Sequence, residues 1–322
     1  MARDDTNRRN SIVGRLVAAG VTLLVMAALL APLFAQQSSA PEGPIVRAGT
    51  AVKVSEHVFV IPDNDMPGVA NIGIVVGRDA VLVIDTGMGK RNGEIVAAEA
   101  QKLGDNKPMY LVTTHVHPEH DLGAHGFPAS TKMIRNSAQI EEIAEVGLRV
   151  AEAFSKRSEL MRELLEGADF RKADVVFDGE HSLDLGGVHV RLLAMGPNHT
   201  PGDTAAFVEE DGVVFAGDVA MRALPSFASP KSSLAHWLSS LDRLEALKPR
   251  VVVPSHGPIG DTGFIAAYRE YLQEVRDRTA AAKAAGQTLE QATQTVIEAL
   301  KPKYPETGRI GGAVRSAYAE AS

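Results

Sequence analysis

The stretch His115-Val116-His117-Pro118-Glu119-His120-Asp121 places three histidines and two carboxylates within seven residues. It follows directly on Met109–Thr113, an apolar and β-branched run that predicts a buried strand. Loops after strands are held by the rigid sheet, and functional side chains concentrate there. Just after a strand, side chains two residues apart point the same way, so His115 and His117 can bind one ion together. The turn that follows directs Glu119 and His120 toward a neighbouring position.

Four more polar segments follow strand-like runs: Asp85-Thr86-Gly87, His199–Thr204, Ala216-Gly217-Asp218 and Pro254–Gly257. The chain has ten histidines, and five of them lie at these strand ends, which indicates a shared site rather than scattered packing residues. Neutral imidazoles and a carboxylate suit zinc, and three protein ligands leave one position open for water. Two adjacent metals need two further histidines and a group between them. His199, His256 and Asp218 supply these.

This series resembles the metallo-β-lactamase superfamily, whose signature is His-x-His-x-Asp-His followed by a single His, an Asp and a last His. The marks occur in the family's order, which makes the match more specific than any one of them. The resemblance runs from about Val52 to the helix after His256. It implies an α/β fold of the four-layer αββα sandwich type, with the site along one edge of the two sheets.

Position by position, the resemblance implies two Zn²⁺ sites. His115, His117 and His199 correspond to the ligands of one metal, and Glu119, His120 and His256 to those of the second. Asp218 corresponds to the carboxylate that bridges both metals, and Asp85 to a strand-end aspartate that supports the site without binding metal. The family's aspartate is Glu119 here, longer by one methylene. The carboxylates expected to take part in catalysis are Asp218, Glu119 and Asp85.

Strand-like and helix-like segments alternate along the chain in two batches. The expected strands are Val52–Ile61, Asn71–Val76, Ala80–Ile84, Met109–Thr113, Val175–Phe177, His181–Leu185, Val188–Ala194, Ala205–Glu209, Val213–Ala216 and Val251–Pro254. The expected helices are Lys90–Leu103, Ser137–Glu166, Leu234–Leu247, Ile265–Ala284 and Leu289–Leu300. Each batch of strands is closed by helices, which predicts two sheets packed face to face with helices outside.

The N-terminal segment is typical of an export signal. Four arginines precede the apolar stretch Leu16–Phe34, and the small residue Ala35 follows it. An uncleaved membrane anchor is the alternative, because the stretch approaches the roughly 20 residues that span a bilayer. We therefore expect residues 1–35 to be a signal, 36–50 a linker, and 51–322 a metallo-β-lactamase-like domain that includes the C-terminal helices. The expected location is the periplasm or outside the cell.

Composition excludes several classes of function. The 322 residues contain no cysteine, which removes thiolate metal sites and cysteine nucleophiles. The formal charge of −7 gives no basic footprint for nucleic acid. The Gly-x-Ser-x-Gly pattern of serine hydrolases is absent as well. The expected partner is a small-molecule substrate, with no nucleic acid and no stable membrane partner once the signal is cleaved. The oligomeric state stays open.

Together these observations predict an exported dinuclear zinc hydrolase. A water on zinc ionises near pH 7, so a metal-bound hydroxide would attack a small carbonyl substrate such as a lactone, an ester or a β-lactam. One alternative is a mononuclear iron oxygenase of the same fold that uses His115, His117 and Asp218. Another is a non-catalytic periplasmic accessory protein. Around the motif, Asp121 is either a spare carboxylate or a helix cap, and Asp203 and Thr204 are expected to fix the His199 loop.

Overall fold

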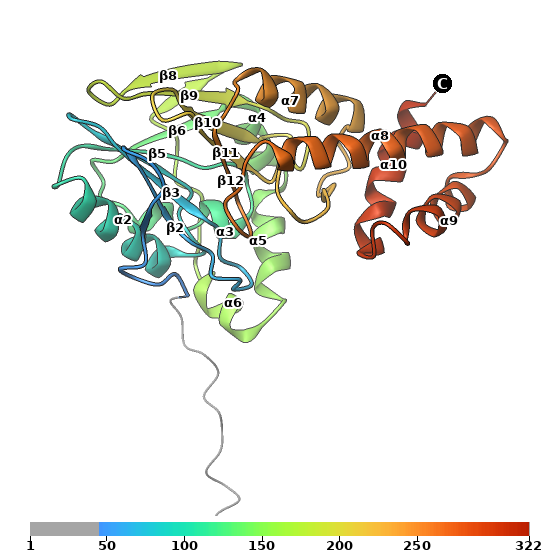
Figure 1. Ribbon diagram of the computed structural model, residues 1–322. Helices are drawn as coiled ribbons and strands as arrows, with labels where there is room; N and C mark the ends of the chain where they lie inside the picture. The colour runs from blue at the N-terminus through green and yellow to red at the C-terminus, as the bar shows by residue number, and fades with distance from the viewer. Residues whose placement is uncertain (1–44, 322) are drawn as a thin grey trace, which may run out of the picture. The chain divides into compact units, whose positions relative to one another are not determined.

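The computed structural model describes residues 45–321, so the predicted export signal lies outside the described residues. Two β-sheets pack face to face, and helices cover both outer faces (Figure 1). The first sheet has the strand order β1-β2-β3-β4-β5-β6-β7, and the second the order β12-β11-β10-β9-β8. This arrangement confirms the predicted αββα sandwich.

The first sheet joins an antiparallel half to a parallel half. Strands β1 to β4 pair antiparallel, and β4 to β7 pair parallel. Its strands are β1 (Val52–Lys53), β2 (Val58–Ile61), β3 (Ile72–Val76), β4 (Val81–Ile84), β5 (Met109–Val112), β6 (Lys132–Asn136) and β7 (Val175–Phe177). The parallel half brings the carboxyl ends of β4 and β5 to the same edge.

The second sheet is antiparallel except for its last pair. Strands β11 and β12 run parallel, and therefore also end at one edge. The strands are β8 (Glu180–Asp184), β9 (His189–Ala194), β10 (Thr204–Val208), β11 (Val213–Gly217) and β12 (Val251–Pro254). The sequences of β10, β11 and β12, rich in Val and Ala, suit strands that are covered on both faces, whereas β8 (EHSLD) is mostly exposed.

Alternation along each strand divides the core into layers. In β4, Val81 and Val83 pack toward the outer helix, while Leu82 and Ile84 pack between the sheets. Successive side chains of a strand point to opposite faces, so a four-residue apolar run serves both layers. In the second sheet, alternate residues of β10 and β11 contribute in the same way to the inter-sheet core and to the core under the outer helices.

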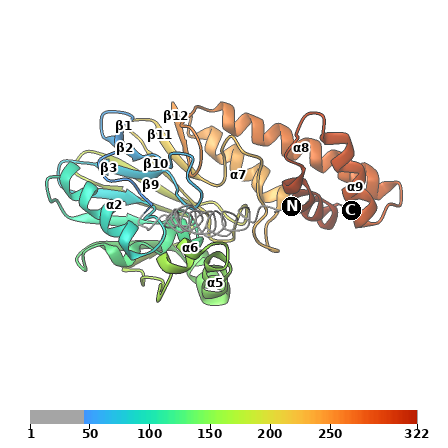
Figure 2. The ribbon, with the colours of Figure 1, turned by 90° about the horizontal axis from the view of Figure 1, so that it is seen from below.

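Helices close both outer faces. The first sheet is covered by α2 (Lys90–Leu103), and the second by the beginning of a C-terminal group of four helices, the last two of which pack on α8 away from the sheets (Figure 2). These four are α7 (Leu234–Ala246), α8 (Gly263–Ala284), α9 (Leu289–Leu300) and α10 (Ile310–Glu320). Among the helices of residues 45–321, none has both the length and the apolarity that crossing a bilayer requires.

Local structure departs from the sequence prediction at four places. The single helix expected over 137–166 is broken into α4 (Ser137–Glu142), a π-helical turn (Ile143–Gly147), α5 (Leu148–Ser155) and α6 (Glu159–Leu164). The last break occurs because Ser158 caps α6, its side chain accepting from Met161 N at 3.1 Å. The strand expected over 52–61 is split into β1 and β2. Strand β6 and helix α10 were not predicted.

The packed part of the chain begins before residue 51. Ile45 and Val46 are buried in the core of the first sheet. Their backbone N–H groups both donate to Asn92 Oδ1 at 2.8 Å, which ties them to α2. Two residues of the predicted linker are therefore part of the folded structure.

Candidate metal centre

The predicted ligands lie in loops at one edge of the two sheets. His115 and His117 follow β5, and the short helix α3 (Pro118–Asp121) carries Glu119 and His120. Pro118 begins this helix at a position where its missing N–H has no intrahelical role. From the second sheet, His199 lies between β9 and β10, Asp218 follows β11, and His256 follows β12. The carboxyl ends of strands are the usual place for sites in open α/β sheets.

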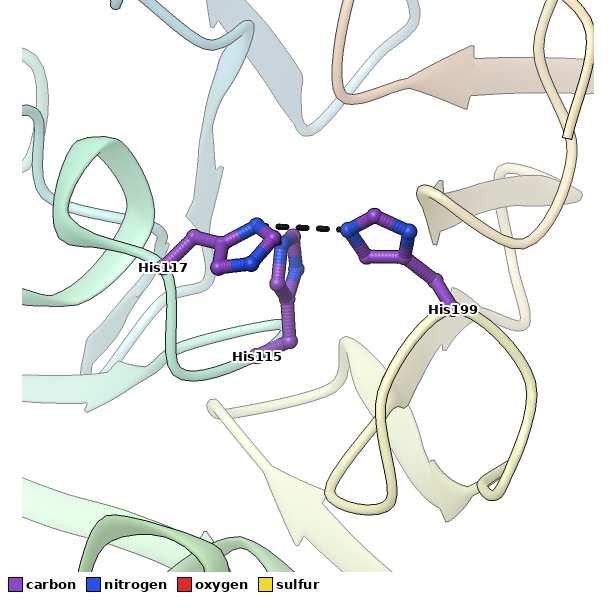
Figure 3. A group of neighbouring side chains, drawn as sticks. All are labelled: His115, His117 and His199. Carbon is purple, nitrogen blue, oxygen red and sulfur yellow. Dashed lines mark hydrogen bonds between the residues drawn. The ribbon is translucent and has the colours of Figure 1, made fainter. Parts of the chain in front are cut away.

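Three histidines form the first group: His115, His117 and His199, which meet from two loops (Figure 3). His117 Nδ1 lies 3.0 Å from His115 Nε2 and 3.2 Å from His199 Nε2. Ligand nitrogens about 2.0–2.1 Å from a tetrahedral zinc are about 3.3 Å apart. Both distances from His117 Nδ1 are therefore close to the spacing of ligands that share one ion.

The other predicted ligands form two further groups that overlap with the first. Glu119, His120 and His256 make one group, and Asp218 makes another with His115 and His120. Within each group the ligand atoms lie within 4.8 Å of one another. Asp218 is thus close to His115 of the first group and to His120 of the second. Its Oδ2 is also 3.4 Å from His199 Nε2. The structure brings all seven predicted ligands together.

The nitrogen that faces away from the centre has a hydrogen-bond partner in four of the five histidines. Thr114 Oγ1 lies 3.1 Å from His115 Nδ1. The carbonyl oxygen of Ser226 is 2.6 Å from His199 Nδ1, and that of Val69 is 3.0 Å from His256 Nδ1. Such outer partners fix the tautomer and the ring orientation of metal-binding histidines. The backbone carbonyls among them could not be identified from the sequence.

Asp85 supports the fourth histidine, where the resemblance placed it. It has a φ of 68°, a left-handed conformation that turns the chain sharply at the end of β4. Its Oδ1 accepts from Thr114 N at 2.7 Å, and its Oδ2 lies 2.8 Å from His120 Nδ1. Asp85 belongs to none of the three potential metal groups of residues 45–321. It therefore orients His120 from behind.

Burial keeps two histidines of the first group neutral. It lowers the pKa values of His115 and His117 well below the usual range, and the surrounding imidazoles lower them further. For His117, the guanidinium of Arg157 adds to this effect; it lies 3.4 Å over the ring of Phe154, which itself packs 5.3 Å from the His117 ring. A histidine must be unprotonated to bind metal. These two ligands are in that form at neutral pH.

The second group is more strongly charged. Burial lowers the pKa of His120, but the carboxylates of Asp85, Glu119 and Asp218 outweigh it and raise the pKa to about 9. Burial raises the pKa of Asp218, yet the histidines around it bring the net value below the usual range. In the metal-free protein these charges compensate one another. A bound cation would take the place of the proton on His120.

Three atoms of this centre indicate that it is built for a metal. Glu119 Oε2, His120 Nε2 and Asp218 Oδ1 are buried and have no hydrogen-bond partner in the described part of the chain. A buried polar atom without a partner is costly and calls for an explanation. All three belong to the potential metal groups, and nitrogen and carboxylate oxygen are donors that zinc accepts. The residues present therefore fit a metal.

Asp121 has neither of the roles expected for it. Its carboxylate pairs with Arg135 on β6 through two hydrogen bonds, one of them 2.7 Å from Nη2 to Oδ1. Both side chains are completely buried, and Thr113 Oγ1 and Gln139 join the cluster. The sequence analysis missed this pair, because the run Lys132–Asn136 carries charges at Lys132 and Arg135 and was not predicted as a strand.

Hydrogen bonds fix the His199 loop as expected. Asp203 Oδ1 accepts from Thr200 N at 3.0 Å and from Thr200 Oγ1 at 2.8 Å. Burial raises the pKa of Asp203 well above its usual range, and Glu142 raises it further. Glu142 on α4 accepts from Gly202 N at 2.9 Å, and burial raises its pKa to about 7. The prediction missed Glu142, because nothing in a helical stretch marks one glutamate as inward-facing.

Comparisons with known proteins agree with this geometry. The human acyl-coenzyme A thioesterase MBLAC2 is 26% identical over 207 residues, which cover 58% of this chain and 72% of the relative. The linear primary-alkylsulfatase of a Pseudomonas strain is 24% identical over 239 residues, which cover 64% of this chain and 44% of the relative. The chain thus spans less than half the length of that alkylsulfatase.

Solved structures show the same fold. The sec-alkylsulfatase Pisa1 from Pseudomonas superimposes with a TM-score of 0.65 at 17% identity, over 83% of this chain and 49% of that one. A metallo-beta-lactamase family protein from Thermus thermophilus superimposes with a TM-score of 0.58 at 20% identity, over 81% of this chain and 91% of that one. The family model of the metallo-beta-lactamase superfamily matches residues 65–256, more than half of the chain. The chain therefore belongs to the metallo-β-lactamase superfamily and is a metal-dependent hydrolase.

Proposed function

We propose that this hydrolase holds two Zn²⁺ ions and cleaves a small carbonyl substrate, a lactone, an ester or a β-lactam, outside the cytoplasm. One observation carries the two-metal proposal. The three ligand groups overlap, and Asp218 stands in the group that takes His115 from one side and His120 from the other. A mononuclear iron oxygenase would give Glu119 and His256 no task. Their convergence on His120 supports the two-metal proposal.

Each predicted residue then has a distinct task. His115, His117 and His199 would hold one ion, Glu119, His120 and His256 the other, and Asp218 would bridge them. When bound, the two cations supply Lewis acidity and a water that ionises near pH 7. Asp85 holds the proton of His120 on Nδ1, so that Nε2 stays available as a ligand. Ser226 O and Val69 O do the same for His199 and His256.

Sulfate esters are the second candidate substrate class. The Pisa1 superposition covers 83% of this chain, whereas the matched β-lactamase DIM-1 covers 70%. A linear primary-alkylsulfatase is also among the relatives by sequence, which supports this substrate class. Thioesters enter the same screen because the human relative is named as an acyl-coenzyme A thioesterase. The expected export of the protein favours the uncharged lactones and esters over intracellular thioesters.

The deciding experiment combines metal analysis with a substrate screen. Inductively coupled plasma mass spectrometry of residues 36–322 is expected to give about two zinc per chain. The zinc-loaded protein is then assayed against a lactone, a carboxylic ester, a β-lactam, a thioester and an alkyl sulfate. One iron per chain would contradict the proposal in favour of the oxygenase. Metal without turnover on the whole panel would favour the accessory protein. Fractionation of expressing cells tests the export.

A further inference from the structure

Two buried asparagines connect the first sheet to the ligand loops of the second sheet. Asn136 ends β6, and Asn71 immediately precedes β3. Their side chains are almost completely inaccessible, with the residues 1% and 4% exposed. Neither residue belongs to a potential metal group of the described chain. Both point instead at the backbone of a loop that carries a predicted ligand.

Asn136 holds the loop of His199. Its Nδ2 donates to Gly202 O at 2.8 Å and to Thr204 Oγ1 at 2.7 Å, while its Oδ1 accepts from Gln139 N at 2.7 Å. All three hydrogen-bonding positions of the carboxamide are therefore used. The bonded residues lie three and five positions after His199. Asn136 thus connects β6 directly to the loop that completes the first ligand group.

Asn71 holds the loop of His256 in the same way. Its Nδ2 donates to Pro254 O at 3.0 Å and to Gly257 O at 2.8 Å, on either side of His256. Its Oδ1 accepts from Asp63 N at 2.9 Å, and its own N–H donates to Ser255 O at 2.7 Å. Asn71 therefore connects the first sheet to the loop that completes the second ligand group.

The chemistry requires a carboxamide at both places. Only a carboxamide offers two N–H donors and a carbonyl acceptor on one short planar group. Aspartate has the same shape but cannot donate when ionised, and glutamine is one methylene too long for the same three partners. The two contacts use no shared residue, so each acts on one ligand loop alone.

We propose that Asn136 and Asn71 are positioning residues, each for one metal. Asn136 sets His199 relative to His115 and His117, and Asn71 sets His256 relative to Glu119 and His120. Each ligand group takes histidines from both sheets, so the metal distances depend on the spacing between the sheets at that point. The inference rests on the two-metal function proposed above. Loss of a group that hydrogen-bonds a metal ligand directly typically weakens metal binding 10–100-fold, and we take this range as the scale for residues that hold the ligand loop.

The test compares Asn136→Ala with Asn71→Ala in the full chain. Stepwise Zn²⁺ affinities are measured by competition with a chelator, and Co²⁺ absorption shows which site fills. We expect Asn136→Ala to weaken the site of three histidines 10–100-fold and to leave the other site within about threefold. Asn71→Ala is expected to do the reverse. Equal weakening of both sites by both variants would overturn the proposal.

The matched control is Asn92→Ala. Asn92 is also fully buried; its Oδ1 accepts from Ile45 N and Val46 N and its Nδ2 donates to Met88 O, so it bonds to none of the segments that carry the predicted ligands. We expect it to lower the melting temperature without shifting either metal affinity. If Asn92→Ala shifted one of the metal affinities, the effects of the other two variants could be explained by general destabilisation. That result would overturn the inference.

A measurement on the metal-free protein separates this inference from the proposed function. Hydrogen–deuterium exchange is expected to rise in the His199 loop for Asn136→Ala and in the His256 loop for Asn71→Ala. Unchanged exchange in both loops overturns the positioning roles even if two metals bind. If Asn136→Ala does not fold, Thr204→Val removes one of its acceptors at constant shape. Asn71→Asp serves in the same way for the second loop, since it keeps the volume and the acceptor.

Discussion

The two ligand groups differ in the chemistry of their side chains and of the partners that orient them. The first consists of three imidazoles, of which His115 and His117 are kept neutral by burial, and its outer partners are a hydroxyl and a backbone carbonyl. The second group contains the carboxylate of Glu119, and its His120 is hydrogen-bonded to the buried carboxylate of Asp85. In the first group, burial keeps the protons off His115 and His117 and so leaves their nitrogens free for a cation. In the second group, the negative charge of the carboxylates attracts the cation.

This difference implies that the two sites can be disturbed separately. Changes to neutral groups should act on the first site through geometry. Changes to carboxylates should act on the second site through charge and proton position. Asp218 stands between them, grouped with His115 from one side and His120 from the other.

The largest effect is expected from His117→Ala. His117 Nδ1 is the nitrogen that lies within 3.2 Å of both other histidines of the first group, so its removal leaves two ligands there. We expect the first metal and hydrolysis to be lost together, as measured by zinc content and by turnover of the best substrate. His189→Ala, at an exposed histidine that bonds Glu210, is the control. Full activity in His117→Ala would contradict the ligand assignment.

Asp85→Asn is expected to disturb the second group through the proton position of His120. Oδ1 must still accept from Thr114 N, so the new amide nitrogen would face His120 Nδ1. Two donors cannot share a hydrogen bond, and the proton of His120 would move to Nε2, the nitrogen needed for metal. We expect the second site to bind 10–100-fold more weakly and the first to be unchanged.

Site-resolved competition titrations measure this effect. Thr279→Val is a suitable control, because Thr279 is equally buried, lies on α8, and has a hydroxyl without a hydrogen-bond partner among the described residues. Equal loss at both sites in Asp85→Asn would show that the aspartate holds the whole loop rather than His120 alone.

The sequence predicted the centre better than its surroundings, for a physical reason. Ligand residues follow strands in a fixed order, so their spacing, together with the family resemblance, marks them. The partners that orient them are backbone carbonyls such as Ser226 O, or residues from segments without a clear pattern, such as Arg135. Strand β6 went unpredicted because a run with charges at both Lys132 and Arg135 lacks the apolar signal of its neighbours, although Arg135 is neutralised inside by Asp121.

The helical region 137–166 shows the limit of periodicity. Apolar residues recur at helical spacing throughout it, but a π-helical turn and the cap at Ser158 divide the segment. Periodicity reports which residues are helical, whereas caps and turns decide where helices end. The inward-facing polar residues of α4, Gln139 and Glu142, became recognisable only with the second sheet in place.

Glu142→Gln tests a buried carboxylate beside the loop of the first group. Glu142 touches the His199 loop through Gly202 N, and a glutamine carbonyl can accept the same bond. Burial raises the pKa of Glu142 from 4.5 to about 7, so the folded state holds the proton more tightly than the unfolded one. The wild-type protein should therefore lose stability as pH rises from 4.5 to 7, by about 1–3 kcal/mol at 1.36 kcal/mol per pKa unit.

The variant should lack this loss. Urea unfolding of the metal-free proteins at pH 5 and pH 8 gives the comparison, with Glu145→Gln as a control at an exposed glutamate of the same segment. We expect Glu142→Gln to be more stable than wild type at pH 8 and similar at pH 5. Parallel pH profiles would show that Glu142 is charged in the folded protein throughout.

The smallest effect is expected from Glu119→Asp, which restores the residue type of the family's signature. Glu119 is 7% exposed, and its Oε2 has no partner among the described residues. A shorter carboxylate keeps the negative charge that distinguishes the second group and changes only its reach. We expect the second site to keep its affinity within tenfold, about 1.4 kcal/mol, or to improve.

Glu119→Gln separates charge from length at this position. It keeps the length and loses the charge, so a second group that depends on negative charge should bind more weakly in this variant than in Glu119→Asp. The opposite order would mean that the loop from His117 to Asp121 is built around the longer side chain. In that case the position of the carboxylate on α3 would matter more for metal binding than its charge. The two groups would then differ in geometry rather than in charge.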